Sequence, residues 1–182
     1  LDQNKLLLNE ARKLVGYLVA QGYKLVALYV YVAIKNEPIY CKIRLENTDG
    51  KKILPMSRNE YGVYELKEPK FGEGLKPIYN QYDLFTNRDD PVWFVEGEKC
   101  VDRLKSLGLL ATTSGSANSV KNADVSILKG RNVIIWYDND IPGKKFAKEI
   151  TAKLQAVNCN VKWVNVEVLN LPEHGDCVDH IE

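Results

Sequence analysis

Three acidic side chains follow apolar runs at positions where a parallel sheet would bring them together. Glu96 comes directly after the run 92–95, and Asp138 and Asp140 come after the run 132–137. In an open parallel sheet, ligands bind at the carboxyl ends of the strands. If the two runs form neighbouring strands, these three carboxylates therefore meet at one rim of the sheet.

Carboxylates held close together repel one another and raise each other's pKa unless a cation lies between them. Ligand sets made only of oxygen favour Mg²⁺ or Mn²⁺, and Mg²⁺ keeps coordination positions open for substrate phosphates. We therefore expect Glu96, Asp138 and Asp140 to bind Mg²⁺ or Mn²⁺ and to act on a nucleotide or polynucleotide. The ordinary alternative is that the Asp138–Asp140 segment is a turn whose side chains cap backbone amides. Gly97 is expected to let the backbone turn tightly beside Glu96.

The elements before these residues read as a small β-rich unit. Apolar residues at helical spacing predict one helix from Asp2 to about Gln21. Short runs rich in Val, Ile and Tyr, separated by turn residues, predict an antiparallel meander from Val26 to Leu66. The segment from Glu68 to Asp90 contains scattered Pro and Gly residues and is expected to be a linker.

From residue 91 onward, short apolar runs alternate with helical patterns, which is typical of parallel βαβ units. Strands are predicted over 92–95, 109–112, 132–137 and 161–166, and helices over 98–107, over about 120–128 and from Pro142 onward. The expected fold class is therefore α/β, with a parallel sheet flanked by helices. The expected domains are residues 1–90, a helix plus a meander and linker, and residues 91–182, the parallel sheet.

Composition excludes several classes of protein. The chain has 182 residues, 45% of them hydrophobic, which is enough for a core. Its net charge of +1 lacks the basic footprint of a protein that grips duplex DNA, so any nucleic-acid contact must be local. No apolar run is long enough for a membrane helix, and a cytoplasmic protein is expected. The first residue is Leu1, and we expect a fragment of a longer chain.

The cysteines are widely spaced, without a C-x-x-C pair, which argues against a disulfide framework and favours reduced thiols. His174, Cys177 and His180 form an H-x-x-C-x-x-H run. On a helix, that spacing would place the three side chains roughly on one face. A structural zinc site needs a fourth ligand, which the run does not supply, so zinc binding here is disfavoured.

Several polar and basic residues are candidates for contacts with phosphate. Lys144 and Lys145 fall in the first turn of a predicted helix, where the macrodipole disfavours cations unless they face an anion. Ser114 lies in a small polar loop that could present amides to a phosphate. In the meander, basic residues interleave with tyrosines, a mixture suited to single-stranded nucleic acid. These are Arg44, Lys51 and Lys52, with Tyr29, Tyr31 and Tyr40. Exposed solubilising lysines and ordinary half-buried tyrosines are the alternatives.

Three segments together resemble the Toprim domain of bacterial primases, topoisomerases and related nucleases. They are Val95-Glu96-Gly97-Glu98-Lys99, Ala111-Thr112-Thr113 and the segment from Trp136 to Gly143, and the resemblance spans about Pro91 to Val166. The Glu-Gly-Glu-Lys form and the preceding meander are similar to primases of phages, plasmids and other mobile elements. Gly175-Asp176 resembles the Gly-Asp element found downstream in that branch.

The resemblance implies a role for each matching residue. Glu96 would be the catalytic acid or base, with Lys99 beside it, and Asp138 and Asp140 would bind the metal. Asp176 would add a further metal or water contact. One departure stands out, because the first motif in this branch often continues with Asp where this chain has Cys100. A thiol does not replace a carboxylate that contacts a hydrated metal.

The function expected from the resemblance is Mg-dependent nucleotidyl transfer by the core of a primase-like replication protein of a mobile element. Its partners would be a single-stranded DNA template, nucleotides and a replicative helicase domain in the parent chain. Two alternatives remain open from the sequence. The same carboxylates serve nucleases, and a non-catalytic module that binds single strands or recruits a helicase would tolerate Cys100.

Overall fold

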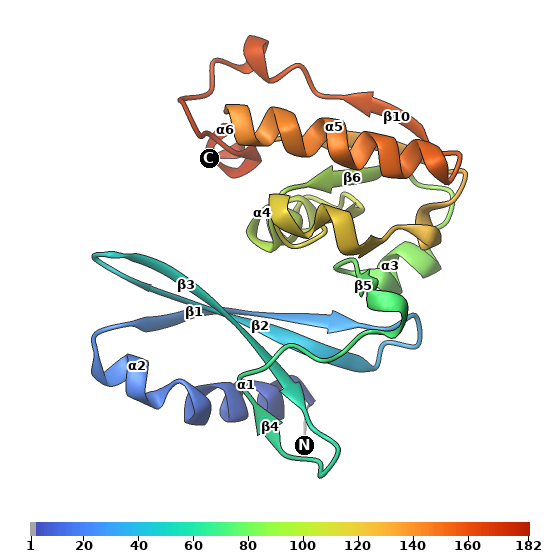
Figure 1. The fold of residues 1–182 in the computed structure, drawn as a ribbon. Coiled ribbons are helices and arrows are strands. Elements are labelled where there is room, and N and C mark those ends of the chain that lie inside the picture. Colours follow the sequence, from blue (N-terminus) through green and yellow to red (C-terminus); the bar gives the residue numbers. More distant parts are fainter. Residues whose placement is uncertain (1–2) are drawn as a thin grey trace. The chain divides into compact units, whose positions relative to one another are not determined.

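The computed structural model describes residues 3–182 and divides into two compact units (Figure 1). The first unit runs up to Val32 and from Glu37 to Phe71. The second contains Gly72–Glu182 together with the loop Ala33–Asn36. The segment 72–90, which was expected to belong to a linker, is therefore part of the second unit.

The first unit is an antiparallel sheet in the strand order β1-β2-β3-β4. Its strands are β1 (Lys24–Val32), β2 (Pro38–Asn47), β3 (Gly50–Arg58) and β4 (Tyr64–Glu65). The turn between β2 and β3 forms because the Asn47 side chain accepts hydrogen bonds from the amides of Asp49 and Gly50, at 2.9 and 3.1 Å. The predicted meander is confirmed.

The helical part of the first unit is split. The structure has α1 (Gln3–Leu14) and α2 (Gly16–Ala20) instead of one helix, and Asp2 lies outside the described residues. Leu7, Ala11 and Leu18 from these helices pack in one core with Ile43 and Leu45 of the sheet. Burial of this apolar stripe against the sheet stabilises helices that are too short to persist alone.

The second unit is built on a parallel sheet in the strand order β10-β9-β6-β7. Its strands are β6 (Val92–Val95), β7 (Ala111–Thr112), β9 (Asn132–Trp136) and β10 (Asn160–Trp163). Its main helices are α4 (Glu98–Ser106) and α5 (Ile141–Ala156), followed by the short α6 (Cys177–Ile181). This confirms the predicted α/β class, with a helix-flanked parallel sheet and a separate antiparallel sheet.

The two main helices cover opposite faces of this sheet. The α4 connection leads from β6 outward to β7, whereas α5 leads from β9 outward to β10 in the other direction, and right-handed crossovers then require opposite faces. Figure 1 shows β6 between α4 and α5. Phe94 of β6 packs against Phe146 of α5, with ring centroids 6.2 Å apart. Both faces of the sheet are therefore buried, which explains the continuous apolar runs in its strands.

The predicted helix over about 120–128 is wrong. The structure has the 3-10 turns η2 (Ala117–Asn122) and η3 (Ser126–Leu128), with β8 (Ala123–Asp124) between them. The Asp124 side chain accepts from the Ser126 amide, and Lys153 Nζ donates to the carbonyl oxygens of Lys121 and Ala123. These side chains form hydrogen bonds with backbone amide and carbonyl groups that would otherwise pair with one another in a helix.

The expected linker also has structure of its own. It contains η1 (Gly72–Gly74), β5 (Lys76–Pro77) and α3 (Gln81–Thr86), and β5 pairs in parallel with β8. Arg131, the residue directly before β9, holds the end of this segment in place. Its guanidinium donates to the carbonyl oxygens of Leu84, Asn87 and Asp90 at 2.5–2.8 Å, so a buried charge finds its partners in backbone carbonyls.

Across residues 3–182, the structure has no helix that combines the length and the apolar character needed to cross a membrane.

Candidate metal centre at the carboxyl rim of the sheet

The strands that precede the acidic residues are neighbours. β6 pairs in parallel with β9, and Val95 is opposite Trp136 in the register. Glu96 and Asp138 therefore leave the sheet at the same rim, as we expected from the sequence. They also come within hydrogen-bonding distance of each other through their side chains.

The contact between Glu96 and Asp138 defines the electrostatics of the rim. The pKa of Asp138 is raised to about 9, first by burial and then by the hydrogen bond with Glu96 and the negative charges of Glu96, Asp176 and Asp140. With this raised pKa, the Asp138 carboxyl group keeps its proton at neutral pH when no cation is present. A divalent cation would displace that proton, and an oxygen-only ligand set of this kind fits Mg²⁺ or Mn²⁺.

Asp140 occupies a structural position as well as a place at the rim. It is the N-cap of α5, and its Oδ1 accepts from the Gly143 amide at 2.6 Å. Its Oδ2 lies 2.7 Å from Nδ1 of His174, and this contact raises the pKa of the imidazole. The turn interpretation of the Asp138–Asp140 segment is thus correct for Asp140, which caps a helix beside the carboxylate pair.

Asp176 reaches the rim from the C-terminal end of the chain. Its Oδ1 caps α6 by accepting from the amides of Val178 at 2.7 Å and Asp179 at 3.3 Å, and the Asp179 side chain accepts from the Asp176 amide. Its Oδ2 lies 3.8 Å from Nζ of Lys99. This capping box orients the carboxylate. Its charge is one of those that raise the pKa of Asp138.

Asn139 joins these two acidic segments, a role that the sequence analysis missed. Its side-chain amide donates to the carbonyl oxygens of Leu171 and Pro172, at 3.0 and 3.2 Å. Its backbone exchanges hydrogen bonds with Gly175 and His174. Asn139 therefore holds the segment before α6 against the end of β9. Its place between two aspartates in a loop was the only available signal.

The close approach of α5 to Asp138 depends on Gly143. A Cβ built at Gly143 would lie 2.2 Å from the Asp138 carbonyl oxygen, which is backbone and cannot swing away. We expect Gly143→Ala to destabilise the protein by about 1–3 kcal/mol and to weaken metal binding, because α5 must shift away from Asp138. Urea unfolding and a Mg²⁺ titration would measure both effects.

Gly97→Ala is the matched control for that substitution. Gly97 has an extended backbone, with φ −133° and ψ 160°, and a Cβ there would meet nothing within 4 Å. The expected tight turn at Gly97 is therefore wrong, and alanine fits this position. A Gly143→Ala protein as stable as the Gly97→Ala protein would contradict the importance of the close approach.

The H-x-x-C-x-x-H run does not form a ligand set. His174 lies before α6 with a φ of 63° and contacts Asp140, whereas the ring of His180 packs edge-on against Trp136. Cys177 instead lies beside Cys100 of α4. The helical spacing fails because α6 begins only at Cys177, so the three side chains point to different neighbours.

The predicted basic contacts have partners within the chain. Lys144 Nζ lies 2.8 Å from Glu167, and Lys145 Nζ lies 3.8 Å from Glu149. Both lysines are exposed on the first turn of α5, close to the rim.

The basic residues of the meander lie in the first unit. Arg44 pairs with Glu46, Lys52 lies over the ring of Tyr23, and Lys51 is exposed on β3. Tyr29, Tyr31 and Tyr40 are buried, and the rings of Tyr31 and Tyr40 stack on each other. The Tyr31 and Tyr40 rings therefore already stack on each other within the sheet, which does not favour stacking of a nucleobase on them.

The polar loop after β7 is held to the rim by its own side chains. Thr113 Oγ1 donates to the Glu96 carbonyl oxygen at 2.7 Å and accepts from the Gly115 amide. Ser114 is buried, and its hydroxyl donates to the Ser116 carbonyl oxygen. The loop therefore positions Glu96 through Thr113, while the Ser114 hydroxyl stays within the loop.

Comparison with known proteins agrees with the fold of the second unit. Residues 100–180 match the family model described as Toprim-like. No curated protein sequence matches the chain significantly. Glu96 lies just before the matched residues, and Asp138, Asp140 and Asp176 lie within them.

Two solved structures share the fold. A primase from Aquifex aeolicus, comprising zinc-binding and RNA polymerase domains, matches with a TM-score of 0.55 and 19% identity over 82% of this chain and 34% of that one. The primase fragment of the bacteriophage T7 primase-helicase protein matches with a TM-score of 0.53 and 16% identity over 86% of this chain and 57% of that one. This chain thus spans about a third of the length of the first structure and somewhat over half of the second. Residues 100–180 match a Toprim-like domain, in a chain that shares its fold with parts of a bacterial and a phage primase.

Proposed function

We propose that the carboxyl rim of the second unit binds Mg²⁺ or Mn²⁺, and that the chain is the nucleotidyl-transfer core of a primase-like replication protein of a mobile element. The observation that carries the proposal is the contact between Glu96 and Asp138, two partly buried carboxyl groups brought together from adjacent strands. Two partly buried carboxyl groups in contact destabilise the folded state unless a cation lies between them, and such pairs are frequent at functional sites.

The residues that would hold the metal are Asp138 and Glu96, with Asp140 and Asp176 at its edges. When bound, Mg²⁺ supplies positive charge to the phosphate oxygens of the nucleotide and of the strand end. The donor set fits this ion, because every candidate ligand atom is a carboxylate oxygen. Asp140 and Asp176 are already oriented by their helix caps, which reduces the entropy lost when they contact the metal or its waters.

Glu96 would act as the base in the reaction. The 3′-hydroxyl of the growing strand would lose its proton to Glu96 as its oxygen attacks the α-phosphorus of the nucleotide, and pyrophosphate would leave. Lys99, at the start of α4, would steady Asp176 and the negative charge near it. Lys144 and Lys145 would exchange their glutamate partners for backbone phosphates. Ser114, Arg44, Lys51 and Lys52 are proposed as weaker contacts to nucleic acid or phosphate.

The proposed partners are a single-stranded DNA template and nucleotides. One matched structure comes from a protein whose name joins a primase to a helicase, which supports the proposal of a helicase domain in the parent chain. The Glu-Gly-Glu-Lys segment at 96–99 supports the mobile-element branch.

A Mg²⁺ titration of the metal-free chain, measured by isothermal titration calorimetry, tests the metal centre. Wild-type protein is expected to bind Mg²⁺ or Mn²⁺, and Asp138→Ala to lose that binding. Incubation with single-stranded template and labelled nucleotides, beside a nuclease assay on the same DNA, then tests the reaction. Extension products support the primase proposal, whereas cleavage without extension replaces it with a nuclease.

A non-catalytic module is the second candidate, and one observation favours it. Cys100 contacts Cys177 and contributes no carboxylate to the rim. Binding to single-stranded DNA without any dependence on Mg²⁺ would support this candidate and contradict both enzymatic functions.

A further inference from the structure

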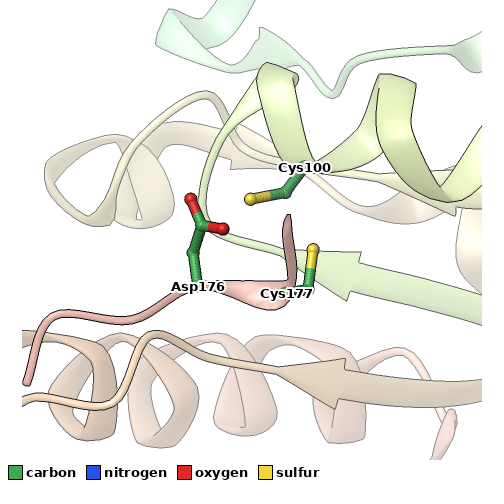
Figure 2. Close-up of side chains that lie close together, drawn as sticks. All are labelled: Cys100, Asp176 and Cys177. Atoms are coloured by element: carbon green, nitrogen blue, oxygen red, sulfur yellow. The ribbon is translucent and has the colours of Figure 1, made fainter. Parts of the chain in front are cut away.

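Cys100 and Cys177, two thiols that the proposed reaction does not use, form a cluster with Asp176, which also stands at the edge of the proposed magnesium site. Cys100 lies in the first turn of α4, Asp176 is the N-cap of α6 and Cys177 is the first residue of α6. The two Sγ atoms and one carboxylate oxygen all lie within 4.8 Å of one another. Figure 2 shows Cys100 projecting from its helix toward Asp176 and Cys177, which lie next to each other on the facing segment. Distant segments of the chain thus deliver two sulfur ligands and one oxygen ligand to one point.

The spacing of these atoms suits a single metal ion. Zinc binds thiolate sulfur at about 2.3 Å and carboxylate oxygen at about 2.0–2.2 Å, so two ligands of one tetrahedral ion lie about 3.6–3.8 Å apart. The three ligand atoms lie within 4.8 Å of one another, so a closure of at most about 1 Å would bring them to these values. Cys100 and Cys177 are 5% and 2% exposed, so the sulfurs lie in a shielded place, whereas Asp176 keeps one side open to solvent.

We propose that Cys100, Cys177 and Asp176 form a binding site for Zn²⁺ or a similar thiophilic divalent ion, with a water in the fourth position. Thiolate ligands select zinc-like ions, whereas the carboxylates of Glu96 and Asp138 suit Mg²⁺. The two sites would therefore stand side by side at one rim with different metal preferences. The zinc ion would fasten α6 to α4 and hold Asp176 in place.

The alternative to metal binding is a disulfide bond between Cys100 and Cys177. Both thiols are buried, which shields them from an external oxidant or disulfide. The carboxylate of Asp176 has no part in a disulfide, but it completes a metal site with the two sulfurs. The presence of all three groups therefore favours the metal.

Cobalt titration of the full chain, stripped of metal and kept in a phosphine reductant, tests the site. Co²⁺ is expected to produce a thiolate-to-cobalt charge-transfer band that saturates at one ion per chain. Zn²⁺ should then abolish this band by displacement, and excess Mg²⁺ should leave it unchanged. Absence of the band, or its loss with Mg²⁺, would overturn the proposal.

Variants assign the ligands. Cys100→Ser and Cys177→Ser are expected to bind at least about a hundredfold more weakly, since loss of an outer-shell partner alone costs about 10–100-fold. Cys159→Ser is the matched control, because Cys159 is a buried thiol of the same unit that donates to the Leu128 carbonyl oxygen. Unchanged affinity in both ligand variants, or an equal loss in the control, would contradict the assignment.

Asp176→Asn tests the carboxylate ligand in a protein that should still fold, because asparagine also caps helices well and both thiols remain. It should keep the charge-transfer band and lose at least about tenfold in affinity. An unchanged affinity would remove Asp176 from the site. Glu96→Gln is expected to leave zinc affinity unchanged, so failure of the zinc site and failure of the proposed Mg-dependent function would be seen separately.

Discussion

Glu96→Gln is expected to lower template-directed nucleotide incorporation by about 10²–10⁴-fold, the range that positioned proton transfer contributes in enzymes. Glutamine keeps the length and shape of the side chain and still forms a hydrogen bond with Asp138, but it does not accept the proton of an attacking hydroxyl. The rate should be measured at saturating Mg²⁺, so that any weaker metal binding does not enter the comparison.

Glu60→Gln is the matched control for this substitution. Glu60 lies exposed in the loop between β3 and β4 of the first unit, so the change in charge is the same at a place remote in sequence from the rim. Both variants should unfold at concentrations of urea close to that of the wild type. Full activity in the Glu96→Gln protein would remove Glu96 from the reaction while leaving the metal centre intact.

Asp138→Asn is expected to make the metal-free protein more stable at pH 8, by at least about 1.4 kcal/mol, which corresponds to a single unit of pKa shift. The pKa of Asp138 is raised by burial and by the Glu96 contact, to about 9 in the folded state, against about 3.9 in an unfolded chain. Between these values the folded state binds more protons than the unfolded state. The contribution of the protonated Asp138 carboxyl group to the free energy of unfolding is therefore fully present below about pH 4 and is lost as the pH rises toward 9.

The measurement is urea unfolding in chelator at several values between pH 5 and pH 8. The wild type should lose stability as the pH rises, with a slope of up to about 1.4 kcal/mol per pH unit for one proton. Asp138→Asn should flatten this slope, whereas Asp49→Asn, at an exposed turn of the first unit, should keep it. Mg²⁺ should restore stability at pH 8 in the wild type but not in Asp138→Asn. A metal-free Asp138→Asn protein that is less stable at pH 8 than the wild type would contradict the account of the buried pair.

Much of the fold follows from local patterns in the sequence. The apolar runs 92–95 and 132–136 are buried on both faces, and such runs mark central parallel strands whatever surrounds them. Pro142 near the start of α5 and Asp140 before it are start signals that act within one turn. The helix predicted over about 120–128 does not form because Lys153, which lies in another element, takes carbonyl oxygens of Lys121 and Ala123 that a helix would use.

The sequence by itself determined which carboxylates leave which strands, since the order of motifs and the alternation of strand and helix are local features. The tertiary structure decided that Asp138 lies beside Glu96 with a raised pKa, because both depend on the pairing of β6 with β9 and on the burial of Asp138. It also decided that Cys177 meets Cys100 and not His174 or His180. Asn139 draws the last segment of the chain against the end of β9, and contacts between residues so far apart in sequence leave no periodic signal to read.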